Sequence, residues 1–173
     1  MLIEDRKEQD YLAEYLKLRE INDQFRARGK DALWSQVETL CAALNRELST
    51  TNNRLDGELI RTGRQPWQFD LKTEAGASTM VGERFGIRYR GQTLLIEIGW
   101  PHEPQHGFIP GGALARARLS FSPNVTIDPI VKAELALWRE GTEISWYEVA
   151  YKQKGALFTE ARLRPYLEMV IKI

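Results

Sequence analysis

The sequence has 173 residues, of which 43% are hydrophobic and 28% are charged, with 24 basic and 24 acidic side chains. This composition is typical of one globular domain spanning residues 1–173, and it excludes disordered and collagen-like proteins. The sequence contains no apolar run of transmembrane length, and the charged start lacks the apolar region of a signal peptide. Because a single cysteine cannot form an internal disulfide, we expect a cytoplasmic protein. The lack of an apolar run of transmembrane length leads us to expect no membrane partner.

The charge is distributed evenly along the chain. Residues 1–55 carry nine basic and ten acidic side chains, and residues 56–173 carry fifteen and fourteen. Nucleic-acid binding usually requires clustered lysines and arginines that neutralise several phosphates. The even distribution therefore disfavours a nucleic-acid partner, although it leaves room for a local cationic patch.

The first part of the chain has helical periodicity. Apolar residues recur every three or four positions over residues 11–25 and again over residues 33–48. Gly29 follows two arginines, as expected at the end of a helix, and Asp31 is a favourable residue for starting the next one. The pattern predicts an antiparallel helical hairpin within residues 1–55.

From residue 64 to residue 151 the hydrophobic period changes from about 3.6 to about 2, as in strands with one buried face. Six such stretches cover residues 67–71, 85–89, 94–100, 113–121, 131–139 and 143–151. Short turns rich in glycine and proline separate most of them, so neighbouring strands must be mostly antiparallel. The prediction is an α+β fold in which the helical hairpin packs on one face of this sheet.

The C-terminal segment, residues 157–173, fits two structures. Pro165 suits the first turn of a helix, which would then run to Lys172. The final Val-Ile-Lys-Ile would serve equally well as a strand. We favour a short C-terminal helix.

Both histidines of the protein lie in residues 101–107, where His102, Glu103 and His106 match the H-E-x-x-H zinc signature. That signature requires one continuous helical turn, so that both imidazoles reach the same metal ion. Pro104 lies between the two histidines and opposes helical geometry. The segment is therefore expected to be a polar loop, with no cofactor, while a non-helical divalent metal or acid–base site on His102, Glu103 and His106 remains the alternative.

Several arginines are predicted on the solvent face of the sheet, namely Arg88, Arg90, Arg116 and Arg118. One interpretation is a solvated face with cross-strand pairs to Glu97 or Glu134. The other is a cationic patch that binds a small anionic or phosphorylated ligand. Trp138 alternates out of phase with the apolar residues of its strand, so we expect it on the same face, as an aromatic candidate for ligand contact.

No motif in the sequence identifies a reaction, and fold alone does not imply function. We expect a non-catalytic binding or scaffold module that forms a homodimer through the apolar stripe of the first helix, which includes Tyr15 and Leu18. The alternatives are a small metal-dependent or acid–base hydrolase centred on residues 101–107 and a small-anion binder that uses the arginines. Cys41 lies on an apolar helical stripe and is expected to be buried.

Overall fold

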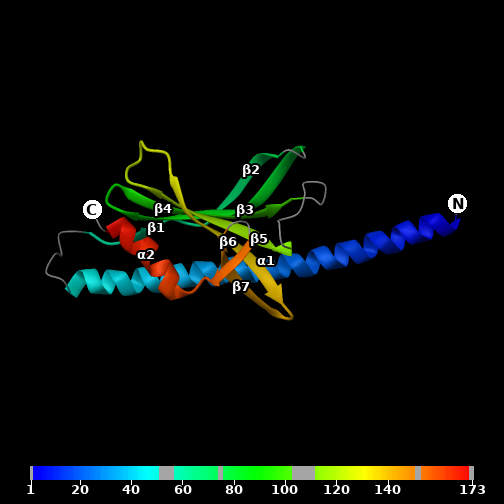
Figure 1. Ribbon diagram of the computed structural model, residues 1–173, viewed down its shortest axis with the longest axis horizontal. Coiled ribbons are helices and arrows are strands. Elements are labelled where there is room, and N and C mark those ends of the chain that lie inside the picture. Colours follow the sequence, from blue (N-terminus) through cyan, green and yellow to red (C-terminus); the bar gives the residue numbers. More distant parts are fainter. Residues whose placement is uncertain (1, 51–56, 74–75, 103–111, 151–152, 172–173) are drawn as a thin grey trace.

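The computed structural model describes residues 2–50, 57–73, 76–102, 112–150 and 153–171. Within these ranges the chain forms a long helix, eight strands and a short helix, shown in Figure 1. Their bounds are α1 Leu2–Thr50, β1 Ile60–Arg61, β2 Gln65–Thr73, β3 Gly76–Tyr89, β4 Gln92–Pro101, β5 Ala115–Ser122, β6 Ile130–Glu140, β7 Glu143–Ala150, β8 Gln153–Leu157 and α2 Glu160–Ile171.

The strands form one antiparallel sheet in the order β1-β3-β4-β5-β6-β7-β8, and β2 pairs with β3. The predicted α+β fold and antiparallel sheet are thus confirmed. The described residues form eight strands where we expected about six, because the short strands β1 and β8 add pairing at the edges. Strand β3 also begins at Gly76, well before the predicted residue 85, because it pairs with β2 over that length.

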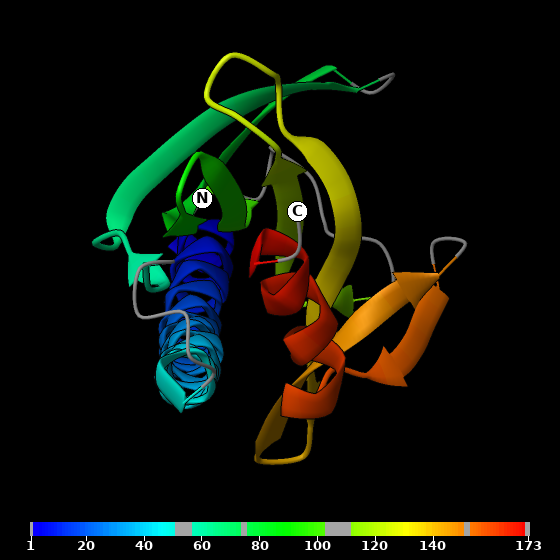
Figure 2. The same cartoon turned by 90° about the vertical axis from the view of Figure 1, so that its left-hand side faces the viewer.

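Both helices lie on the same side of the sheet, which arches over them. Figure 2, in which α1 is seen nearly end-on, shows α2 beside α1 within the curve of the strands. Alternate residues of the strands point toward the helices and are buried, as the period of two predicts. The largest fully buried side chains come from both helices and four strands: Phe85, Leu33, Ile87, Leu94, Ile96, Ile98, Leu119, Leu135, Leu137, Leu163, Leu167 and Val37.

The predicted helical hairpin is not confirmed, because α1 continues without a break through Gly29 and Asp31. Gly29 does not adopt the left-handed conformation of a helix-ending glycine. It lies instead where α1 crosses the sheet, and a Cβ atom built on it would lie 2.4 Å from Cδ2 of Leu137. The indole Nε1 of Trp146 donates a hydrogen bond of 2.9 Å to the Gly29 carbonyl. The glycine therefore permits close packing of helix on sheet.

Side chains from the sheet also engage the residues that were expected to form the turn. Lys30 Nζ lies 2.8 Å from Glu83 Oε1, and Arg64 Nη1 lies 2.7 Å from Asp31 Oδ1. A second guanidinium nitrogen of Arg64 contacts Glu83 at 2.7 Å. Asp31 is thus an ion-pair partner on the surface of a continuous helix, where it does not cap a helix start.

The C-terminal helix is confirmed as α2. It begins at Glu160, several residues before the predicted start, because the Thr159 carbonyl accepts hydrogen bonds from the amides of Arg162 and Leu163. Pro165 therefore lies inside the helix, where the sequence pattern had placed the first turn.

We expect Gly29→Ala to lower the free energy of unfolding by up to about 2 kcal/mol, measured by urea denaturation. Alanine gains about 1 kcal/mol over glycine in a helix interior, but overpacking against a fully buried leucine typically costs about 1–3 kcal/mol. Leu137 is 0% exposed and has little room to move.

The control for this change is the same substitution in a Leu137→Ala background, which removes the Cδ atoms that the new methyl group would meet. There Gly29→Ala should be neutral or stabilising. An increase in stability on the wild-type background would contradict the close approach of α1 to the sheet.

Candidate functional site

The face of the sheet that points away from the helices carries a row of alternating charges. Arg84 on β3 is opposite Glu97 on β4, which is opposite Arg118 on β5, which in turn is opposite Glu134 on β6. Arg116 Nη2 also contacts Glu134, at 3.1 Å, while Arg118 Nη2 lies 3.9 Å from the other carboxylate oxygen. Arg116 and Arg118 therefore share the carboxylate of Glu134. Partly exposed pairs of this kind contribute a few tenths of a kcal/mol each to stability.

The structure separates the four arginines that the sequence singles out. Arg88 lies on β3 opposite Thr93, away from Glu134, and it is exposed. Arg90 lies at the turn between β3 and β4 with φ of 54°, and its guanidinium carbon is 5.5 Å from the centroid of the Tyr89 ring. The arginines thus occupy three places on β3, its turn and β5, and they do not form one patch. Ligand binding by any of them stays a prediction.

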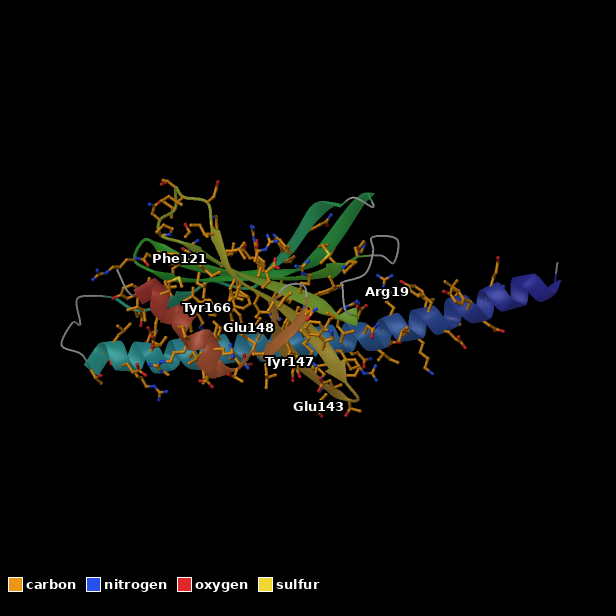
Figure 3. All side chains as sticks on the ribbon, in the orientation of Figure 1. Arg19, Phe121, Glu143, Tyr147, Glu148 and Tyr166 are labelled. Atoms are coloured by element: carbon orange, nitrogen blue, oxygen red, sulfur yellow. The ribbon has the colours of Figure 1, made fainter. Side chains whose placement is uncertain are left out.

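Trp138 lies near the other edge of the sheet, in an aromatic cluster. Its ring forms a T-shaped contact with Tyr147, with centroids 5.9 Å apart, and Lys154 Nζ lies 5.9 Å from its centroid. Figure 3 labels Tyr147 on β7, the strand that pairs with β6. The structure therefore places Trp138 with Tyr147 and Lys154, and apart from Arg88.

The H-E-x-x-H segment is only partly described. His102 follows the end of β4, and its amide donates a hydrogen bond of 2.9 Å to the Thr79 carbonyl, which extends the pairing with β3. His102 lies in a bend directly after the strand, so it does not begin the helical turn that the zinc signature requires. Glu103 and His106 lie outside the described residues, so convergence of these side chains, and the hydrolase built on it, stays a prediction.

The described residues contain neither a metal-binding cluster nor a membrane-spanning helix. No group of three or more histidine, cysteine, aspartate or glutamate side chains within those ranges is placed to hold a metal ion. Likewise, neither described helix combines the length and apolarity needed to cross a bilayer.

Cys41 faces the core from α1 and is 2% exposed. Burial raises the pKa of its thiol to about 11, against a smaller opposing effect of the nearby Arg61 charge. Because the thiolate is the nucleophilic form, a thiol with so high a pKa is unreactive at neutral pH. Cys41 is therefore a small core residue, as the sequence predicts.

Two carboxyl groups on opposite faces of the sheet, Glu97 in the charge row and Glu83 beside α1, have pKa values shifted in opposite directions. Burial raises the pKa of Glu97, although Arg118 and Arg84 oppose the rise. Burial would also raise the pKa of Glu83, but hydrogen bonds from Lys30 and Arg64 outweigh it and lower that pKa. Ionised Glu97 therefore costs folding free energy at neutral pH, whereas ionised Glu83 contributes to it.

We expect the two glutamine variants to show pH dependences of opposite sign between about pH 3 and pH 7. Folded wild-type protein holds the Glu97 proton more tightly than the unfolded chain, so the stability from Glu97 is lost as pH rises through its raised pKa. The unfolding free energy of Glu97→Gln minus that of wild type should therefore increase with pH. For Glu83→Gln the same difference should decrease, because the wild-type stabilisation is lost only as pH falls through the lowered pKa.

Urea denaturation at several pH values measures both differences, and each variant is the control for the other. A parallel pH dependence of the two variants would contradict the opposite electrostatic environments of Glu97 and Glu83.

A hollow of about 170 Å³ lies beside Arg88 on the outer face, between β1, β3 and β4. Its polar lining comes from Thr62, Gln65, Arg84, Arg88 and Thr93. Arg84 is not one of the four arginines predicted as ligand contacts, although the period of two places it on the same face as Arg88. Thr62 lies between β1 and β2, outside any strand pattern, so alternation gives no signal for it.

The second candidate surface is the part of α1 that extends past the sheet (Figure 1). We call residues 8–24 of α1 the arm, in which no residue is buried. Tyr11 is 76% exposed, and Leu12, Leu16 and Leu18 are 56%, 52% and 55% exposed. Figure 3 labels Arg19 near the point where α1 passes the strands, with the rest of the arm beyond it.

The chain matches no protein-family model. Neither a curated protein nor a solved structure resembles it significantly.

Proposed function

We propose that this protein is a non-catalytic binding or scaffold module that assembles as a homodimer through the arm. The observation that carries the proposal is the exposure of Tyr11, Leu12, Leu16 and Leu18 on a helix that extends past its own sheet. Helices in proteins are stabilised mostly by tertiary packing of an apolar face. Exposed apolar side chains gathered on one side of a helix mark interaction surfaces, and Tyr11 and Leu18 lie on one side together with Tyr15.

The apolar stripe of the arm is continuous with the stripe that the sheet buries. Tyr15, Leu18 and Phe25 follow one another at three- to seven-residue intervals, and the next turns of the same face carry Gly29 and Leu33, which are buried. The face that packs beneath the sheet therefore continues into solvent along the arm. Another helix of the same kind would cover it in the way that the sheet covers its C-terminal part.

The charges of α1 favour a second copy as that partner. Residues 8–14 of the arm carry three acidic and no basic side chains, a net charge of −3, and residues 15–24 carry two acidic and two basic ones, a net charge of zero. A parallel pair of arms would align the two negative segments, whereas an antiparallel pair places each negative segment against the neutral segment of its partner. Avoidance of like-charge repulsion thus supports an antiparallel homodimer with two-fold symmetry.

We expect the wild-type protein to sediment as a dimer at micromolar concentration, and Leu18→Glu to convert it to a monomer. The substitution places a charge in the apolar stripe that the partner would cover. Sedimentation velocity measures the change. Ile130→Glu is the matched control, because Ile130 lies on β6 with 54% exposure, against 55% for Leu18, and this variant should stay dimeric. A wild-type monomer at all accessible concentrations, or equal dissociation by both variants, contradicts the proposal.

Single cysteine substitutions test the orientation. If Leu18 lies at the two-fold axis, the two copies of residue 11 are about 20 Å apart along an antiparallel pair, at about 1.5 Å per residue. Leu18→Cys should then form an intermolecular disulfide under mild oxidation, and Tyr11→Cys should not. Rapid disulfide formation by both variants would instead show a parallel pair.

A further inference from the structure

The hollow on the outer face has the dimensions and lining of a site for a small charged group. Its volume of about 170 Å³ is below the range of about 300–1,000 Å³ that is usual for drug-sized ligands. Arg84 and Arg88 project from β3 on either side of Gly86, while Thr62 and Thr93 belong to the segments that flank β3. No acidic side chain is among the described residues that line it.

Gly86 creates the floor of the hollow, and its backbone does not require glycine. Its φ is not in the left-handed region, and a Cβ atom built on it would have ordinary contacts, at 3.5 Å to Thr62 Oγ1 and 3.5 Å to Thr93 Cγ2. A glycine inside a strand weakens it, and it commonly marks a bulge or a position where another group approaches closely. Space for a methyl group therefore stays open between the two arginines.

A bulge at Thr62 adds to the polar lining. The Gly86 amide donates to Thr62 Oγ1 at 2.7 Å, and the Thr62 amide donates to the Gly86 carbonyl at 2.8 Å. Because its oxygen accepts the Gly86 amide, the Thr62 hydroxyl keeps its own proton for another acceptor. The hydroxyl of Thr62 is thus held at the edge of the hollow as a hydrogen-bond donor.

The two arginines differ in their partners. The charge of Arg84 acts on Glu97, which also faces Arg118 in the next strand. Arg88 is exposed, and within the described part of the chain its side chain has neither a hydrogen bond nor an ion pair. This contrasts with Arg116, which is paired with Glu134 on the same face. Arg88 therefore presents an uncompensated guanidinium at the hollow.

We infer that this hollow binds the phosphoryl group of a small phosphorylated ligand. Arg84 and Arg88 would bind its oxygens from two sides, and the Thr62 hydroxyl would donate a third hydrogen bond. Guanidinium groups match the geometry of phosphate oxygens and form strong charge-assisted hydrogen bonds with them. Gly86 leaves the space that the group occupies. The site is independent of the arm, so it does not depend on dimer formation.

The test is titration of the full chain with inorganic phosphate, followed by calorimetry and by the amide NMR signal of Gly86. We expect saturable binding that shifts this signal, and Arg88→Gln should weaken the affinity by about tenfold or more. Arg88→Gln should keep the wild-type unfolding midpoint, because Arg88 contacts no charged partner within the described residues. Gly86→Ala should also weaken binding, since it fills the hollow without changing the charge.

Arg116→Gln is the matched control, because it removes one arginine from the same face but outside the hollow, and it should leave the affinity unchanged. Absence of saturable phosphate binding overturns the inference. Equal weakening by Arg116→Gln and Arg88→Gln also overturns it, because it would indicate a general charge effect. Titration with acetate separates the two anion chemistries, and acetate binding as tight as that of phosphate overturns the assignment to a phosphoryl group.

Discussion

At Gly29 the backbone of α1 lies directly against the paired residues Leu137 and Trp146 of β6 and β7, and this crossing determines how α1 lies on the sheet. The indole of Trp146 fixes the helix along its axis through the Gly29 carbonyl, and Lys30 and Asp31 fix its rotation through Glu83 and Arg64. The residues that follow, from Leu33 to Leu44, are then held beneath the sheet as its buried stripe. Because glycine has no side chain, this contact brings helix and sheet closer than other residues allow.

The strands could be predicted from the sequence, whereas the continuous path of α1 through Gly29 could not. A period of two results directly from burial of one sheet face, so Leu94, Ile96 and Ile98 predict their strand without knowledge of its neighbours. The hairpin was predicted because Gly29 and Asp31 are residue types that often end and start helices. In the structure Gly29 instead permits close packing on Leu137, and Asp31 forms an ion pair with Arg64. Glycine allows close approach as readily as a left-handed turn, and aspartate pairs with a distant arginine as readily as it caps a helix. Only tertiary contacts decide between these uses.

The outer face shows a similar limit. Alternation places Arg84, Arg88, Arg116 and Arg118 on one face, but it does not determine which of them pair with acids. That choice depends on register across four strands, which sets Arg118 opposite Glu134 and leaves Arg88 opposite Thr93. Thr62 is harder still to predict, because a bulge between two edge strands brings it to Gly86. The residues 103–111 lie outside the described part of the chain, so the chemistry suggested by His102 and its neighbours stays a prediction.

The unbroken path of α1 through Gly29 has a geometric consequence for the arm. An α-helix turns by about 100° per residue, so the direction in which Leu18 points relative to the sheet is determined by the number of residues between it and Gly29. Inserting or deleting a single residue between Leu18 and Phe25 would leave the contacts of Phe25 and Gly29 with the sheet in place but rotate the apolar stripe to a different side of the molecule. The number of residues in this segment therefore determines the angle about the helix axis between the sheet and anything bound to the arm.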